Sequence, residues 1–183
     1  MKNTLLLKGA IATGVLFAAM AGANAATYDL QAVSIGVPKS FQAIVGAGLF
    51  GDTFTFTLPT NGGSGYSVID FPLTLPGFVF STSFSAITLY SAGTNGVPGG
   101  NDDTLLATST TPGNGSLTLA FGPSASGAYF IDIFGRGEGT AGGLYNGSIS
   151  VTAIPEPENY AMLLAGLGVM GAIAMRRNKS KSS

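Results

Sequence analysis

The sequence contains no cysteine, no histidine and no tryptophan. Without cysteine, no disulfide can stabilise the protein and no thiol can act as a nucleophile. Without histidine, the usual general base and most zinc sites are absent as well. Glu138 is the only glutamate between residues 26 and 153, which disfavours a carboxylate pair for glycoside hydrolysis. We therefore expect that the protein is not an enzyme and has no cofactor, with Ca²⁺ left open below.

Charged residues are also scarce, at 9% of the chain. The basic ones lie mostly near the two ends, and residues 26–153 contain only Lys39 and Arg136 against seven carboxylates. A segment so poor in lysine and arginine lacks the electrostatic footprint of nucleic-acid binding. An acidic segment with few charges suits a surface or matrix protein that owes its solubility to serine, threonine, asparagine and glycine.

Residues 1–25 have the organisation of a Sec signal peptide. Two lysines precede an apolar run over residues 11–20, and Ala23 and Ala25 supply the small residues of a cleavage site. The alternative, an uncleaved anchor, is disfavoured because the run is short and ends in small residues. We predict export through the Sec translocon, followed by signal-peptidase cleavage after Ala25.

Residues 26–153 alternate between apolar and polar side chains, and no stretch among them has a convincing helical period. A period of two is typical of strands with one buried face. We therefore predict an all-β domain, a single antiparallel β-sandwich and specifically a jelly roll of about nine short strands. The strands are expected at 27–34, 41–46, 52–58, 66–73, 80–90, 104–109, 116–121, 128–135 and 146–154.

Glycine and asparagine mark the expected connections between these strands. Asn-Gly pairs supply the positive φ angles of tight turns. Such pairs begin at Asn61, Asn95, Asn114 and Asn146. Long glycine-rich loops are expected at 60–65, 92–103 and 135–143.

Two segments repeat one pattern, FGDTF from Phe50 and FIDIF from Phe130. In a strand, each aspartate would share a face with its two flanking phenylalanines, Asp52 with Phe50 and Phe54 and Asp132 with Phe130 and Phe134. A buried, unpaired carboxylate there would be costly. We favour an aspartate at a strand end or edge that accepts backbone N–H groups. The alternative is a buried carboxylate bonded to backbone donors or to a cation.

Two further features could bind ligands. Asp102 and Asp103 lie in the longest loop and could hold Ca²⁺, although their spacing matches no known calcium loop and a solvated turn is favoured. Thr53, Thr55 and Thr57 form a threonine row that could contact ice or a sugar polymer. Threonine is also common on the wet face of a strand, and a single row is not an array.

Residues 154–183 form a tail with three parts: a Pro-Glu-Pro segment, an apolar run over 160–175 and a basic end. Proline is tolerated in the first turn of a helix, so we expect a helix that begins at about Pro157. The apolar run would span roughly 24 Å, less than a ~30 Å hydrocarbon core. Arg176 and Arg177 can snorkel, so we predict a single transmembrane helix with a cytoplasmic C-terminus.

The order Pro155, Glu156 and Pro157, then an apolar helix, then Arg176 and Arg177 closely resembles the PEP-CTERM sorting signal of Gram-negative bacteria. This resemblance implies processing by an exosortase, a membrane-embedded cysteine-dependent enzyme that is expected to cut near Pro-Glu-Pro. Such proteins are associated with exopolysaccharide and biofilm matrix, and the same tail also ends some ice-binding proteins.

The FGDTF segment, with Phe50, Asp52 and Phe54, resembles the FxDxF type of PEP-CTERM protein. That resemblance implies a secreted β domain and no particular chemistry. We expect a non-catalytic protein that is exported, is held briefly in the inner membrane, and is then delivered to the cell surface or extracellular matrix. The alternative is a polysaccharide-, calcium- or ice-binding module that is delivered by the same route.

Overall fold

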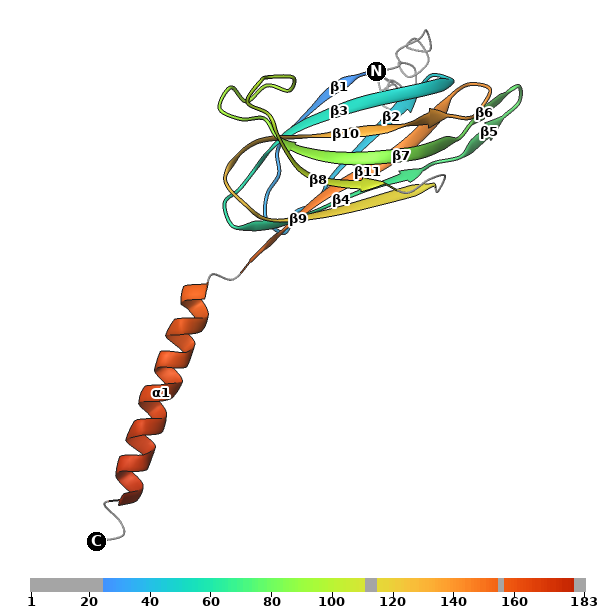
Figure 1. Cartoon of the computed structure of the whole chain (residues 1–183). Helices are drawn as coiled ribbons and strands as arrows, with labels where there is room; N and C mark the ends of the chain where they lie inside the picture. The colour runs from blue at the N-terminus through green and yellow to red at the C-terminus, as the bar shows by residue number, and fades with distance from the viewer. Residues whose placement is uncertain (1–24, 111–114, 155–156, 180–183) are drawn as a thin grey trace, which may run out of the picture.

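The computed structural model describes residues 25–110, 115–154 and 157–179. In these residues eleven strands are followed by one helix (Figure 1). The elements are β1 (Thr27–Ala32), β2 (Lys39–Val45), β3 (Gly48–Leu58), β4 (Gly62–Asp70), β5 (Leu73–Leu75), β6 (Phe78–Phe80), β7 (Thr82–Ser91), β8 (Thr104–Thr110), β9 (Ser116–Ser124), β10 (Gly127–Gly137), β11 (Gly143–Ala153) and α1 (Pro157–Lys179).

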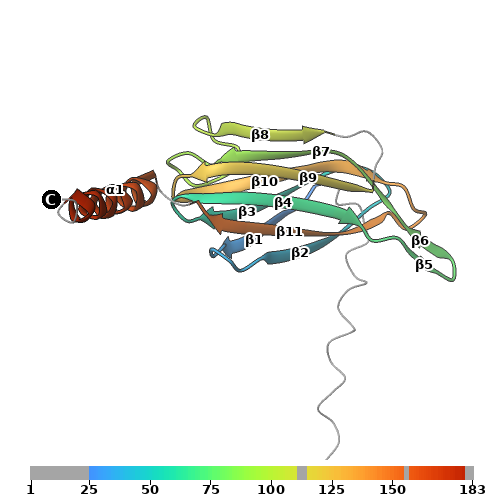
Figure 2. The same ribbon diagram turned by 90° about the horizontal axis from the view of Figure 1, so that it is seen from below.

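Two sheets form the body of the protein and overlap one behind the other in Figure 2. The hydrophobic core lies between them. One sheet has the order β1-β3-β10-β7-β8 and the other has the order β2-β11-β4-β9. The predicted all-β sandwich is therefore confirmed. The short β5–β6 hairpin pairs only with itself and was missed, because its residues were assigned to the flanking strands and the connection between them.

The strands pair in a nested order. β7 pairs with β8, β4 with β9, β3 with β10, and β2 with β11, all antiparallel. In this order, the strands of each pair flank those of the preceding pair in the sequence. Successive pairs do not belong to the same sheet throughout: β3–β10 and β7–β8 lie in one sheet, and β2–β11 and β4–β9 lie in the other. Eight strands in this order are the topology of a jelly roll.

One strand pair departs from the antiparallel expectation. β1 runs parallel to β3, with Thr27 opposite Thr53 and Tyr28 opposite Phe54. The chain leaves β1, crosses to the other sheet for β2, and returns to the first sheet as β3. Two successive reversals restore the original direction, so β1 and β3 can only be parallel.

Alternating side chains fill the core between the sheets. Along β3, the side chains of Phe50, Phe54, Phe56 and Leu58 are buried on the same face as Asp52, whereas the residues that alternate with them are more exposed. Burying one such side chain contributes about 1.5–3 kcal/mol. The period of two that predicted these strands is thus the period of their packing.

Two expected connections are wrong. Asn146 and Gly147 lie inside β11, where Gly147 leaves room for the ring of Phe41, and a Cβ there would overlap it. The loop expected at 60–65 is instead the short connection before β4, which begins at Gly62. Asn61 does adopt the positive φ angle (56°) that its turn requires.

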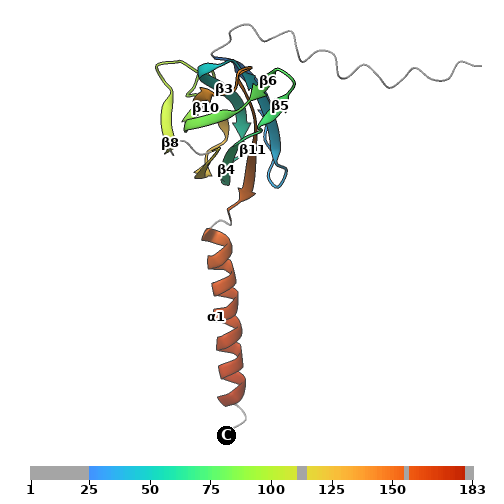
Figure 3. The same ribbon diagram turned by 90° about the vertical axis from the view of Figure 1, so that its right-hand side faces the viewer.

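Helix α1 projects away from the sandwich (Figures 1 and 3). It begins at Pro157, as predicted, and spans 23 residues. Its large apolar side chains at Met162, Leu163, Leu164 and Met170 are 62–76% exposed. The sequence predicted a single transmembrane helix here. Within the described ranges, no helix is both long enough and apolar enough to cross a membrane.

Candidate functional site

A buried carboxylate lies between the two sheets. Asp52 is on the inner face of β3 and is 1% exposed. The hydroxyl group of Tyr145 donates a 2.6 Å hydrogen bond to Oδ2, and the backbone N–H of Ala26 donates a 3.0 Å bond to Oδ1. Burial raises the pKa of Asp52 above its usual range, and these two hydrogen bonds oppose the rise.

The partners of Asp52 come from two directions. Tyr145 belongs to β11 in the opposite sheet, and its ring packs between Phe50 and Phe84 at centroid distances of 5.6 and 5.5 Å. Ala26 precedes β1 and is held by the N–H of Thr53, which donates to its carbonyl at 2.8 Å. Both donors are therefore held in place by the fold: ring packing holds the phenol, and a backbone hydrogen bond holds the amide.

The favoured expectation for Asp52 is wrong on its position, because the residue lies within β3, which is flanked by β1 and β10, and not at a strand end or edge. The expected backbone N–H donor is present and comes from Ala26. The buried-carboxylate alternative is the one observed, with a phenol as one of the two donors. Neither Tyr145 nor Ala26 was predicted as a partner. The small-residue cleavage site does single out Ala26 as the first residue after it, but no sequence signal points to Tyr145.

The second aspartate motif faces the other way. Asp132 lies on the outer face of β10, between Ile131 and Ile133, which are fully buried. The hydroxyl group of Thr53 donates to Asp132 Oδ1 at 2.6 Å. Partial burial raises the pKa of Asp132, and the negative charge of Asp103 adds to this effect. FGDTF and FIDIF therefore share a spacing and not an orientation.

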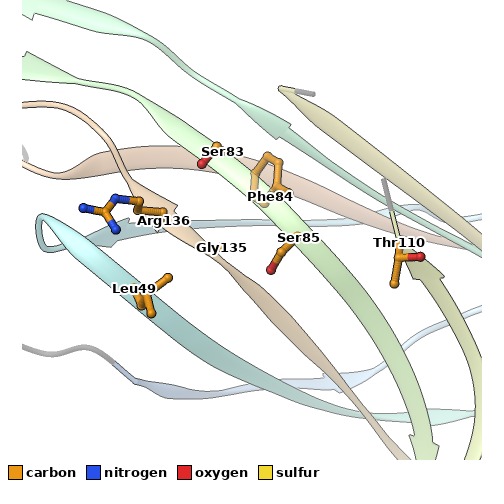
Figure 4. A pocket seen from close by; sticks show the side chains of 7 residues that line it. All are labelled: Leu49, Ser83, Phe84, Ser85, Thr110, Gly135 and Arg136. Carbon is orange, nitrogen blue, oxygen red and sulfur yellow. The ribbon is translucent and has the colours of Figure 1, made fainter. Parts of the chain in front are cut away.

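A shallow groove of about 420 Å³ lies on the outside of the five-stranded sheet. In Figure 4, Leu49 and Arg136 lie on one side of β7 and Thr110 lies on the other. Arg136 also forms a 3.6 Å ion pair with Glu138, and both side chains are about half exposed. The remaining lining residues are Ser83, Phe84, Ser85 and Gly135.

The aspartates of loop 92–103 are engaged by their own loop. Asp102 Oδ2 accepts the N–H groups of Thr94 and Asn95 at 2.7 and 3.1 Å, and these bonds lower its pKa. Asp103 Oδ2 accepts the N–H of Gly99 at 2.7 Å, while its Oδ1 is buried and accepts no hydrogen bond from any described residue. Where the structure describes the chain, no group of three or more acidic residues is placed to hold a metal ion.

The threonine row lies on the outer face of β3, between the neighbouring strands β1 and β10. Thr53 bonds Asp132, and the hydroxyl group of Thr55 donates to the carbonyl of Tyr28 at 3.3 Å. The hydroxyl groups of Thr53 and Thr55 therefore already have hydrogen-bond partners within the protein, which leaves them less free to bind a ligand.

The predicted sorting residues are far from the sandwich core or outside the described ranges. Ala23, Pro155 and Glu156 lie outside the described residues. Arg176 and Arg177 lie in the last turns of α1.

Neither a family model nor any curated protein matches the sequence. Among solved structures, the pre-peptidase C-terminal domain of a Bacillus anthracis collagenase has a TM-score of 0.39 at 15% identity, covering 69% of this chain and 94% of that domain. CorA, a surface-associated copper-binding protein of Methylomicrobium album BG8, has a TM-score of 0.42 at 10% identity, covering 71% and 100%. A mutant of the Escherichia coli periplasmic lysozyme inhibitor PliG has a TM-score of 0.32 at 14% identity, covering 69% and 98%. Likeness at this level carries no information on function.

Proposed function

We propose that this chain is an exported, non-catalytic surface or matrix protein that an exosortase sorts and processes through its C-terminal tail. The observation that carries the proposal is the exposure of α1. Six large apolar side chains between Met162 and Met170 are 60–76% exposed, on a helix that leaves the sandwich. Apolar surface of this extent marks a site of membrane or protein interaction.

The membrane is the covering that the tail sequence favours. The apolar run over 160–175 enters the inner membrane, and Arg176 and Arg177 reach back to the cytoplasmic headgroups. Pro155, Glu156 and Pro157 then separate this run from the folded domain, where an exosortase has access to the chain. Cleavage there delivers residues 26–153 to the cell surface or to an exopolysaccharide matrix.

The intact mass of the protein from cells and medium, in hosts with and without the exosortase, tests this function. We expect a released species that lacks the residues beyond about Pro157, and only in the host with the enzyme. A matched variant with Glu156→Gln keeps the apolar run and removes one feature of the motif, so its release should fall. If residues 160–175 stay attached in both hosts, the tail is an anchor and the proposal fails.

A second candidate function is binding of a matrix polysaccharide in the groove of Figure 4. Arg136 supplies a charge for acidic sugars, Ser83 and Ser85 supply hydroxyl groups, and Leu49 supplies an apolar contact. A glycan microarray tests it, with Arg136→Ala as the variant and Lys39→Ala as the control. Lys39 is the other cation of the sandwich and lies in the opposite sheet. Binding that is equally affected by both changes would contradict a site in this groove.

A further inference from the structure

The first residue after the predicted signal cleavage site contacts the buried carboxylate. The nitrogen of Ala26 is 3.0 Å from Asp52 Oδ1. We propose that hydrolysis of the Ala25–Ala26 bond turns this nitrogen into an α-ammonium group that becomes the buried counter-ion of Asp52, so that removal of the signal peptide stabilises the domain. The inference rests on the export step of the proposed function and is independent of the tail.

Before cleavage, Asp52 has two hydrogen-bond donors and no cation. Tyr145 and the Ala26 amide are both neutral donors. The cations of residues 26–153 are Lys39 and Arg136, and among the described residues no ion pair reaches Asp52. An ionised carboxylate that is 1% exposed and lacks a counter-ion is strongly disfavoured, because burial removes its hydration.

Cleavage supplies the missing charge at the right atom. A signal peptidase adds one water molecule across the Ala25–Ala26 bond, which leaves a carboxylate on Ala25 and an amino group on Ala26. An α-amino group has an ordinary pKa of about 7.7–8.0, so it is protonated at neutral pH. The new ammonium group carries a full positive charge and three N–H donors in place of one.

The fold already holds Ala26 in place. The N–H of Thr53 donates to the Ala26 carbonyl at 2.8 Å, and β1 then pairs with β3 from Thr27 onward. The ammonium group therefore forms where the amide nitrogen was, and no large movement is needed. This differs from a flexible surface pair, in which ordering two side chains cancels most of the gain.

The titratable groups that face Asp52 are Tyr145 from β11 and Tyr28 from β1. Burial raises the pKa of both phenols, so neither ionises near neutral pH. The Ala26–Asp52 pair is therefore the titrating unit of this site between acid and mildly alkaline pH. Its contribution should be largest between the titration of the carboxyl group and that of the amine.

Two chains that differ by one residue test the inference. One begins at Ala26 and the other at Ala25, and both run to Ser183 in a mild non-ionic detergent. At pH 6.5 we expect the chain that begins at Ala26 to melt higher by about 5 °C, because only it places its amine at Asp52. The pair raises the folded pKa of the amine, so the gap is full between the titration of the Asp52 carboxyl group and pH ~7.7, and it closes as pH rises through the folded pKa of the amine. Equal melting temperatures at pH 6.5 would overturn the inference.

Asp52→Asn in both chains provides the matched control, and the gap between them should then vanish. A second readout does not depend on the stability of that variant. NMR titration of the ¹⁵N-labelled Ala26 amine in the parent should give a pKa above the ordinary ~7.7–8.0. An ordinary value would overturn the inference.

The N-terminus of the exported protein, read by mass, separates this inference from the proposed function. A start at Ala26 supports the inference even where the tail stays uncut. A start at any other residue overturns it even where the tail is processed.

Discussion

Tyr145 and Asp52 are 93 positions apart in the chain and are joined across the sandwich by a 2.6 Å hydrogen bond from the phenol to the carboxylate. Tyr145→Phe keeps the ring among its aromatic neighbours and removes this donor. Because a buried acceptor would lose its partner, we expect a loss of about 1–3 kcal/mol in the free energy of unfolding. Urea denaturation at pH 7 measures it.

Tyr129→Phe is the matched control for that change. The Tyr129 hydroxyl group donates to the carbonyl of Ala125 at 2.8 Å, so the acceptor that loses its donor here is a neutral group. We expect a loss of about 0.5–1.5 kcal/mol for this variant. If the two variants lose the same stability, the charge and burial of Asp52 add nothing to the Tyr145 bond.

The raised pKa of Asp132 predicts a pH dependence of stability. Burial is the main cause, the hydrogen bond from Thr53 opposes it, and the charge of Asp103 adds to it. A raised folded pKa means that the folded state binds the proton more tightly than the unfolded state. The contribution of Asp132 is thus most favourable below the unfolded value of about 3.9 and declines as pH rises through the folded value.

Asp132→Asn should remove that decline while keeping an acceptor for Thr53. Denaturation curves between pH 3 and 7 should show a flatter profile for the variant than for the parent over the acid part of the range. Glu138→Gln changes the net charge by the same amount at an exposed position and serves as the control. A profile for Asp132→Asn that parallels the parent would contradict the assignment.

The strands and their inner faces could be predicted from the sequence because their period is the period of packing. The orientation of the two aspartate motifs could also have been predicted from the sequence. In FIDIF the residues that alternate with Asp132's face are Ile131 and Ile133. Both are apolar, so they face the core and Asp132 faces outward. In FGDTF the alternate residues are Gly51 and Thr53, so the aromatic set faces the core and Asp52 is buried with it.

The partners of Asp52 could not be predicted from the sequence, for a physical reason. Tyr145 lies in the other sheet, and only the nested pairing of strands brings it opposite β3. Alternation fixes which way a side chain points, but it says nothing about what lies opposite. The parallel start of β1, which places Ala26 beside Asp52, also depends on how the chain crosses between the sheets.

Asp102 is predicted to order its loop through backbone hydrogen bonds. Asp102→Ala removes the acceptor of the Thr94 and Asn95 amides, so hydrogen exchange at these two amides should become faster. Because the same bonds lower the pKa of Asp102, its contribution is present above pH ~3.9 and is lost as pH falls through the folded value. Unchanged exchange in the variant would contradict this role.

A calcium titration of the parent and of a second variant tests the cation alternative for this loop. A melting temperature that rises with Ca²⁺ in the parent and not in an Asp102→Asn/Asp103→Asn variant would assign a calcium site. No shift in either protein would leave the carboxylates with their backbone partners alone.

Gly147 is predicted to resist replacement, because the Phe41 ring occupies the space that a side chain would need. A Cβ at this position would overlap the Phe41 ring, which lies across the strand pair that β11 forms with β2. Gly147→Ala should therefore destabilise the domain by about 1–3 kcal/mol, as overpacked cores do, and urea denaturation measures this loss.

Gly115→Ala is its control, because a Cβ there would lie 3.6 Å from the Cβ of Asp70, an ordinary contact. We expect a change within about 0.5 kcal/mol. A double variant with Phe41→Leu and Gly147→Ala completes the test, since a smaller side chain at position 41 should recover part of the loss. If the costs of the two changes simply add, the ring and the glycine are not coupled and the packing explanation fails.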